Sequence, residues 1–239
     1  MFNDHYDDVD DIKIIEILSP YVSDERKQKI DSILAQRTYT ITCILDNIHD
    51  EGNINAVIRT AENFGYQSLN IISSQKIKKS NRVTRGTDKW IDIKRFDDYH
   101  TCLSEIKAKG FKILATSLSS EKAMPLSAID EKIFCSTSSP LAIIFGNEKD
   151  GVRKELVEAA DYVAYISTVG FAQSFNISVA AAIALYHVYQ SRVKIRGGQG
   201  DLSESELLRL RARFYYKSVN NSEKIINHFL RGRKLNEKK

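Results

Sequence analysis

The stretch LAIIFGNEKDGVRKELVEAA, residues 141–160, decides the fold class of this chain. Its first six residues, LAIIFG (141–146), form an apolar run that is typical of a buried strand. The residues GVRKELVEAA (151–160) predict a helix, and the polar turn before them contains Glu148. Because a glycine stands at each end of this turn, the backbone there can approach a ligand closely. The turn matches neither GxxxxGK[ST] nor GxGxxG, and a plain tight turn with Glu148 at the start of the helix is the alternative.

The same alternation of strand, polar loop and helix extends along the chain in both directions. Five more segments predict strands because they are rich in β-branched and aromatic residues: 38–45, 68–73, 91–96, 111–118 and 162–167. The spacing of apolar residues predicts helices over 24–35, 55–65, 101–110 and 178–192. A glycine-rich linker (196–202) and two amphipathic helical pieces follow. This alternation predicts a largely parallel α/β sheet, in which ligands bind beyond the carboxyl ends of the strands.

The composition excludes several classes of protein. The chain has 239 residues, of which 42% are hydrophobic, so it can form a sizeable core and is not disordered throughout. No apolar run reaches the roughly 18 residues that a membrane span needs, and the acidic N-terminus does not resemble a secretory signal. The three cysteines form neither a disulfide framework nor a CxxC pair, and the five histidines show no metal-ligand spacing. We therefore expect a cytoplasmic protein that has no metal and no membrane partner.

Charge is unevenly distributed, although the net charge is only +4. The first residues are acidic, whereas basic residues gather between Lys76 and Arg95 and again from Arg192 to the C-terminus. Two basic clusters on a mildly basic protein favour a polyanionic partner such as a nucleic acid. A solvated surface that keeps the protein in solution is an equally good interpretation from charge alone.

Two further polar segments follow predicted strands. NINAVIRTAENFG (53–65) carries Asn53 and Arg59, which can approach one point if Asn53 lies in the loop and Arg59 on the first helical turns. GFAQSFNISVAAAIALY (170–186) carries Ser174, Asn176 and Ser178 ahead of a helix of small residues. Each segment has a structural alternative, namely a capping asparagine with a surface arginine, or Ser178 as a cap before a helix that packs closely.

Together, and in this order, the three segments resemble the signature motifs of the SPOUT methyltransferases. They are most similar to the TrmH branch, the ribose 2'-O-methyltransferases of tRNA and rRNA, over about residues 24–192, including RGTDKW (85–90). The resemblance implies a SPOUT fold, with a mostly parallel α/β sheet flanked by helices, a C-terminal deep trefoil knot and helical terminal extensions. It also implies a homodimer that uses S-adenosylmethionine (SAM) as methyl donor. The implied reaction is methylation of a D-loop guanosine of tRNA, with an rRNA ribose methyltransferase or a catalytically silent RNA-binding protein as alternatives.

The resemblance also implies roles for individual residues. Arg59 would activate the ribose 2'-hydroxyl and Asn53 would orient Arg59, and the other polar motif positions complete the catalytic set: Glu148, Ser174 and Asn176. Four positions would line the SAM site: Thr116, Gly146, Ile166 and Phe175. Phe175 replaces the usual leucine, and YIST (165–168) replaces the usual Ile-Pro-Met, so the adenine site is expected to differ in shape.

Basic residues outside the motifs are expected to neutralise RNA phosphates. The candidates lie in the segment before residue 90 and in the C-terminal extension: Arg82, Arg85, Lys89, Arg209, Arg211, Arg213, Arg231 and Arg233. The expected domains are an acidic N-terminal extension over 1–23, interpreted as a disordered tail, a SPOUT domain over 24–195 and a basic helical extension over 196–239.

Overall fold

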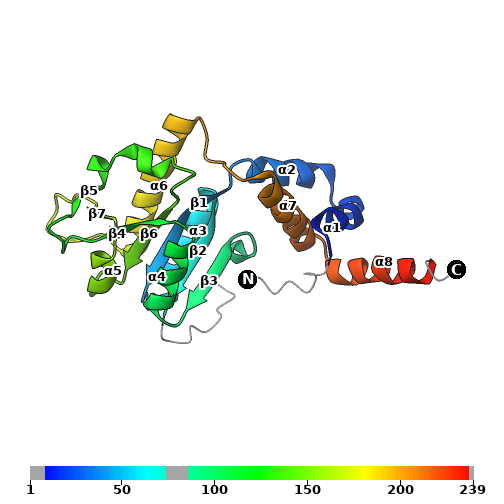
Figure 1. The fold of residues 1–239 in the computed structure, drawn as a ribbon, viewed down its shortest axis with the longest axis horizontal. Helices are drawn as coiled ribbons and strands as arrows, with labels where there is room; N and C mark the ends of the chain where they lie inside the picture. Colours follow the sequence, from blue (N-terminus) through cyan, green and yellow to red (C-terminus); the bar gives the residue numbers. More distant parts are fainter. Residues whose placement is uncertain (1–8, 74–85, 237–239) are drawn as a thin grey trace. The chain divides into compact units, whose positions relative to one another are not determined.

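The computed structural model describes residues 9–73 and 86–236, with side chains up to residue 230. Its internal contacts divide the chain into two compact units. The first is an α/β unit, Thr38–Asp201. The second is a helical unit formed by the two ends of the chain, Met1–Arg37 and Leu202–Lys239. Figure 1 shows the elements of both units in the colours of the sequence.

The α/β unit contains a seven-stranded sheet in which every pair of neighbouring strands is parallel, as the sequence predicts. The strand order is β3-β2-β1-β6-β4-β7-β5. The strands are β1 (Thr38–Asp46), β2 (Tyr66–Ile72), β3 (Asp92–Phe96), β4 (Lys112–Thr116), β5 (Met124–Pro125), β6 (Leu141–Gly146) and β7 (Tyr162–Tyr165). The two-residue β5 is absent from the sequence-based prediction, because so short a pairing leaves no pattern. The trefoil knot stays a prediction.

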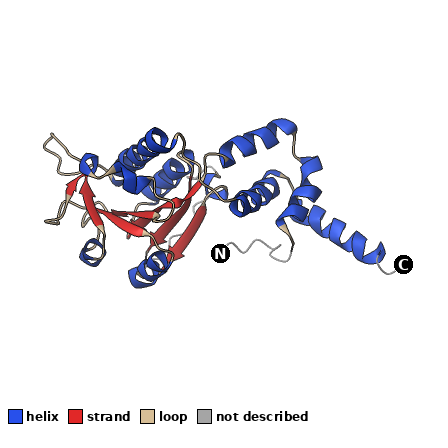
Figure 2. Ribbon diagram, turned by 45° about the horizontal axis from the view of Figure 1, so that its top comes forward, coloured by secondary structure: helices blue, strands red, loops and turns tan. Residues whose placement is uncertain are grey.

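Helices cover both faces of this sheet (Figure 2). They are α3 (Glu51–Asn63), α4 (Tyr99–Ala108), α5 (Lys154–Glu158) and α6 (Ile177–Arg196), with short 3-10 turns at Thr87–Lys89, Leu126–Ala128 and Glu131–Phe134. Alternate residues of β1 point to opposite faces, so Cys43 and Leu45 pack in the same cluster as α3 and α6. Ile44 packs on the other face with Cys102 of α4 and Leu156 of α5. The sheet is thus buried on both sides, which explains its continuous apolar strands.

The helical unit corrects two expectations about the N-terminal region. Residues Asp11–Leu18 form a helix, α1, instead of a disordered tail, because Ile14, Ile17 and Leu18 are spaced to bury one helix face. A 3-10 turn (Ser19–Tyr21) leads to α2 (Asp24–Leu34), which clusters with the C-terminal helices and not with the sheet. The boundaries therefore differ from those expected at residues 24 and 195.

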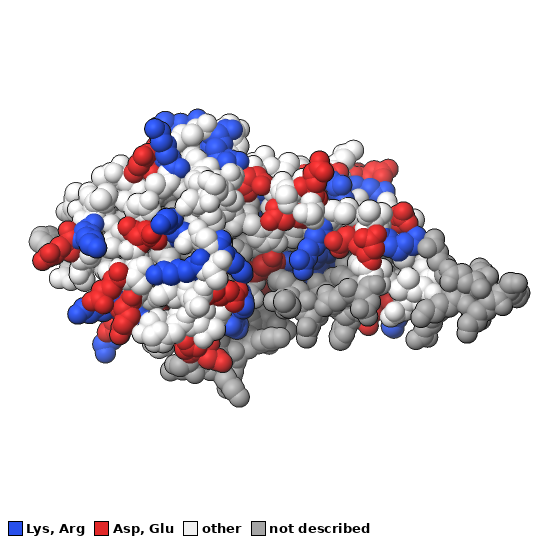
Figure 3. All heavy atoms as spheres, in the orientation of Figure 1, with Lys and Arg blue, Asp and Glu red and all other residues white. Residues whose placement is uncertain are grey.

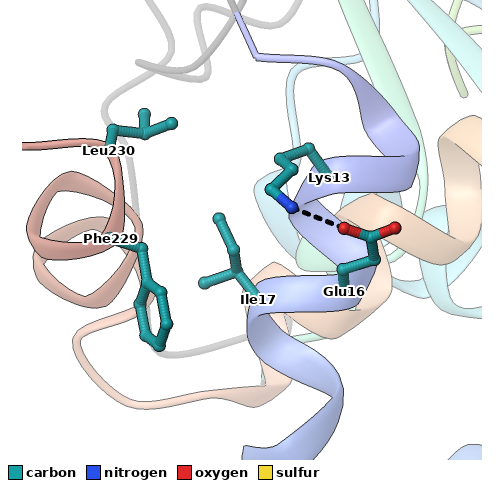
Figure 4. Close-up of a pocket in the computed structure, with 5 residues that line it drawn as sticks. All are labelled: Lys13, Glu16, Ile17, Phe229 and Leu230. Carbon is teal, nitrogen blue, oxygen red and sulfur yellow. Dashed lines mark hydrogen bonds and ion pairs between the residues drawn. The ribbon is translucent and has the colours of Figure 1, made fainter. Parts of the chain in front are cut away.

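The C-terminal part of the helical unit consists of α7 (Glu204–Ser218) and α8 (Ser222–Asn236), as the two amphipathic pieces predict. A capping box formed by Ser203 and Glu206 starts α7. A pocket of about 170 Å3 lies between α1 and α8, where Phe229 faces Ile17 beside the Lys13–Glu16 ion pair (Figure 4). No helix in the described residues is long and apolar enough to cross a membrane.

The segment after α6 is not a free linker, and Arg192 is not a surface charge. Arg192 is fully buried and forms an ion pair with Asp201, at 2.5 Å between Nη2 and Oδ2. Its guanidinium also donates to the Phe134 carbonyl (2.7 Å) and to Oε1 of Gln199 (3.0 Å). A buried arginine with this many acceptors is compensated for its loss of hydration. These bonds hold the chain after Gly197 against the sheet unit.

Candidate functional site

The first candidate segment starts its helix earlier than expected. The side chain of Asp50 accepts a hydrogen bond from the backbone N–H of Asn53 (2.7 Å), so α3 begins at Glu51 and Asn53 lies in its first turn. Six residues advance about 600° around a helix, which sets the side chains of Asn53 and Arg59 about 120° apart. Arg59 is exposed, and its guanidinium has no hydrogen bond or ion pair to the described residues. The expected contact between Asn53 and Arg59 is therefore not formed.

Asn53 instead joins the other two candidate segments. Its amide Nδ2 donates to Oε1 of Glu148 at 2.5 Å, and its Oδ1 accepts from Nδ2 of Asn176 at 3.3 Å. The three side chains come from α3, from the turn after β6 and from the residue before α6. The structure thus brings together three of the five catalytic candidates, although they are far apart in the sequence.

Asn176 has a structural role in addition to this contact. Its Oδ1 accepts from the backbone N–H of Ser178 (2.9 Å) and from the Ser178 hydroxyl (2.6 Å), so Asn176, and not Ser178, is the N-cap of α6. Its Nδ2 remains available for Asn53. Ser174 is exposed two residues earlier, and its hydroxyl has no hydrogen-bond partner among the described residues. The catalytic candidates therefore comprise a linked trio, Asn53–Glu148–Asn176, and two unpaired side chains, Ser174 and Arg59.

The turn that carries Glu148 is held by hydrogen bonds to the side chain and the carbonyl of Asn147. Oδ1 of Asn147 accepts from the N–H groups of Lys149 (2.9 Å) and Asp150 (2.7 Å), and the Gly151 N–H donates to the Asn147 carbonyl. A Cβ on Gly146 would lie 1.9 Å from the carbonyl carbon of Gly151, so the turn folds directly over Gly146. Because α5 begins only at Lys154, Glu148 lies in this turn and not in the first turn of a helix.

A buried ion pair that the sequence does not predict lies beside this turn. Asp46 ends β1, is 2% exposed, and binds Arg153 through both the backbone N–H and the guanidinium. Asp46 at the end of an apolar strand is a signal for such a pair, but the sequence does not show which basic side chain pairs with it.

The expected SAM-lining residues lie near the carboxyl ends of neighbouring strands. Thr116 ends β4, Gly146 ends β6, and Ile166 directly follows β7. The Thr116 hydroxyl donates to the Ile144 carbonyl (2.8 Å), and Ile166 packs against the core. Phe175 lies on the segment before α6 and is 41% exposed. Three of these positions, Thr116, Gly146 and Ile166, therefore lie together at the carboxyl edge of the sheet. The fourth, Phe175, has an exposed ring on the segment that enters α6.

The expected RNA-binding residues have different outcomes. Lys89 and Arg209 are exposed, as an RNA contact requires. Arg211 is half-buried and pairs with Asp31 of α2 at 2.9 Å. Arg213 is 7% exposed, so its assignment to the RNA-binding surface is wrong. The remaining candidates lie outside the residues whose side chains are described: Arg82, Arg85, Arg231 and Arg233. On the face in Figure 3, basic and acidic residues are interspersed.

Comparison with known proteins identifies the family. The sequence profile of the SpoU rRNA methylase family matches residues 40–186, and the chain belongs to this family. The matched region starts in β1, ends in α6 and contains the Asn53–Glu148–Asn176 trio. Within the family, a tRNA (guanosine(18)-2'-O)-methyltransferase of Borreliella burgdorferi is 34% identical over 92% of this chain and 98% of its own length.

Two solved structures are similar as well. The Aquifex aeolicus TrmH/SpoU tRNA modifying enzyme has 30% sequence identity and a TM-score of 0.70, over 82% of this chain and 98% of its own. An AdoMet-bound rRNA methyltransferase from Sinorhizobium meliloti has 26% identity and a TM-score of 0.57, over 67% of this chain and 59% of its own.

Proposed function

We propose that this chain transfers a methyl group from SAM to the ribose 2'-hydroxyl of guanosine 18 in tRNA. The observation that carries the proposal is the Asn53–Glu148–Asn176 trio, which joins the three family segments beside an exposed Arg59. The substrate is suggested by the Borreliella burgdorferi relative, whose name states this reaction and whose length is covered almost completely. Methylation of rRNA, and RNA binding without catalysis, are the alternatives that the experiment below separates.

Arg59 is the residue that acts on the RNA in this proposal. A guanidinium stays protonated at any ordinary pH and offers a planar fork of donors that fits a phosphate. Since Arg59 has no partner among the described residues, its fork is free to bind the phosphate beside the target ribose and to stabilise an alkoxide-like oxygen. In the second version Arg59 itself takes the proton that the 2'-hydroxyl loses on methylation, which requires its guanidinium to give up its own proton first.

Asn53 then acts differently from its expected role. Both ends of its amide are engaged, by Glu148 and by Asn176, so it fixes the first turn of α3 and sets the position of Arg59 through the helix. The Ser174 hydroxyl has no partner among the described residues and lies on the segment that leads to Asn176, where it can donate to the substrate. The protein's contribution is mainly to hold the ribose and its hydroxyl in place, since good positioning alone lowers such barriers substantially.

The same edge of the sheet has suitable residues for SAM. When bound, SAM supplies a reactive sulfonium methyl group, which is the chemistry that the protein lacks. Leu118 and Phe175 are apolar and 58% and 41% exposed, which suits contact with an adenine ring. Backbone groups near Thr116, Gly146 and Ile166 supply polar contacts at the ends of three adjacent strands. The relative from Sinorhizobium meliloti is described as AdoMet-bound, which supports this cofactor for the family.

A homodimer is the proposed assembly, and α6 carries the surface that supports it. Val179, Ile183 and Tyr186 are 45%, 37% and 51% exposed and recur at helical spacing, so they form one apolar stripe. The Phe64 ring lies 5.8 Å from that of Tyr186 and extends the stripe onto α3. A second copy of the chain would cover this stripe.

The test is incorporation of labelled methyl groups from SAM into unmodified tRNA and, separately, into rRNA, followed by mapping of the 2'-O-methylated nucleotide. We expect methylation of guanosine 18 in tRNA, lost in Arg59→Ala while SAM still binds. Methylation of rRNA alone would keep the chemistry and overturn the substrate. SAM binding without turnover on any RNA would favour the silent RNA-binding alternative.

A further inference from the structure

The buried ion pair between Asp46 and Arg153 spans the base of the turn that carries Glu148. Asp46 lies opposite Gly146 in the register of β1 and β6, so it stands beside the residue where the turn begins. Its Oδ2 accepts from the backbone N–H of Arg153 (3.0 Å), and its Oδ1 accepts from Nε (2.8 Å) and Nη2 (2.6 Å) of the same residue. The carboxylate of Asp46 therefore fixes the C-terminal end of the turn at Arg153, and the pairing of β1 with β6 places Asp46 beside the N-terminal end at Gly146.

The rest of the turn has little freedom once its ends are fixed. The Asn147 side-chain oxygen accepts from the backbone N–H groups of Lys149 and Asp150, and Val152 is buried in the core. The turn also lies directly over Gly146, which leaves no room for it to collapse toward the strand. The residues from Glu148 to Gly151 are exposed, and from this tip Glu148 reaches Asn53.

Asp46 is also the last residue of the strand that leads into α3. Asn47 follows it with a left-handed backbone (φ 54°) and donates its N–H to the Ile72 carbonyl, and Asp50 then caps the helix. Asp46 thus lies where the Glu148 turn meets the chain that enters the Asn53 helix. A charge-assisted, multiply bonded contact at such a junction is strong and geometrically specific.

We propose that Asp46 is a positioning residue for methyl transfer. It acts through Glu148, by fixing the turn after β6 in the position from which Glu148 contacts Asn53. This inference rests on the proposed function, because its kinetic readout is methylation of tRNA. It makes no claim that Asp46 touches RNA or SAM, since its carboxylate is buried under Arg153.

The test is a double-mutant cycle in the full-length protein. Asp46→Asn keeps the shape of the side chain but removes the charge that pairs with Arg153. We expect kcat to fall about 10- to 100-fold, because misplacement of a catalytic group by about 1 Å has an effect of that order. If Asp46 acts through Glu148, then Asp46→Asn has less than about a threefold further effect in a Glu148→Gln background.

Asp201→Asn is the matched control. It removes the charge from a second buried arginine–aspartate pair of the same unit, Arg192–Asp201, at 2.5 Å. All variants are assayed below their melting temperatures, with rates normalised to the fraction that binds SAM. A purely structural role for Asp46 predicts that both aspartate variants lose stability alike and that neither kcat effect depends on Glu148. Equal losses of kcat from Asp46→Asn in the two backgrounds would therefore overturn the proposal.

Hydrogen exchange tests the same inference without activity. Asp46→Asn is expected to speed amide exchange at Lys149, Asp150 and Gly151 at least about tenfold more than Asp201→Asn does. Unchanged exchange at these amides would refute the role of Asp46 even if kcat fell. If the wild-type protein methylates neither tRNA nor rRNA, the proposed function fails, and the exchange experiment still decides whether Asp46 holds the turn.

Discussion

Replacement of Gly146 by alanine should disable the site by moving the Glu148 turn. A Cβ at this position would lie 1.9 Å from the carbonyl carbon of Gly151 and 2.0 Å from the backbone nitrogen of Val152. Ordinary contacts begin near 3.4 Å, so the turn must move by about 1.5 Å, and the atoms in its way are backbone atoms. A shift of that size breaks the 2.5 Å contact between Glu148 and Asn53.

The expected result of Gly146→Ala is a fall in kcat of about 100-fold, because a displacement of about 1 Å at a catalytic group can have an effect of that order. Overpacking should lower the stability by about 1–3 kcal/mol, which leaves a folded protein. The assay is single-turnover methylation of tRNA with labelled SAM, together with thermal unfolding. Gly198→Ala is the control, since a Cβ there meets no atom within 4 Å. Retention of at least a third of the activity by Gly146→Ala would refute the reasoning.

Four further predictions follow from the described side chains. Arg59→Lys should lower kcat at least about tenfold without a change in SAM affinity measured by calorimetry, because lysine lacks the planar fork. Arg209→Glu should weaken tRNA binding and reduce the slope of log affinity against log salt by about 1 or more, as measured by filter binding at several salt concentrations. Ile183→Glu should shift the mass measured by light scattering from dimer to monomer. Burial raises the pKa of the Cys43 thiol to about 12, so iodoacetamide at pH 8 should label Cys135 before Cys43 in the folded protein.

The sequence predicts the sheet well because its strands are buried on both faces. β6 is an unbroken apolar run, and β1 is rich in β-branched residues although it contains Thr38, Thr40 and Thr42, so composition marks the positions of both strands. The sequence does not predict the N-terminal helix α1, because acidic residues such as Asp10 and Asp11 make the segment resemble a disordered tail. The apolar face of α1, by contrast, depends on the spacing of only three residues: Ile14, Ile17 and Leu18.

The sequence predicts the residues of the candidate site better than it predicts the contacts between them. Motif order identifies Asn53, Glu148 and Asn176, but which polar groups pair depends on loops that meet only in the folded chain. The expected Asn53–Arg59 contact is not formed because Asp50 caps α3 and the helix begins at Glu51. Asn53 therefore lies inside the helix and not in the preceding loop. Capping competes with the loop at this point, and a single sequence does not show which conformation is favoured.

The arginines of α7 show why a count of charges overstates the surface that can bind RNA. Arg209, Arg211 and Arg213 alternate along one helix, yet their exposure falls from exposed to half-buried to buried. Arg211 pairs with Asp31 at a site where both side chains remain accessible, 38% and 53% exposed, so the pair is weak and Arg211 can exchange Asp31 for a phosphate. Arg213 cannot make that exchange, because it lies among the buried residues of α7. Contacts within the chain thus show that α7 helps to hold the helical unit together, through the Arg211–Asp31 pair, whereas the attraction of a polyanion by the basic tail stays a prediction.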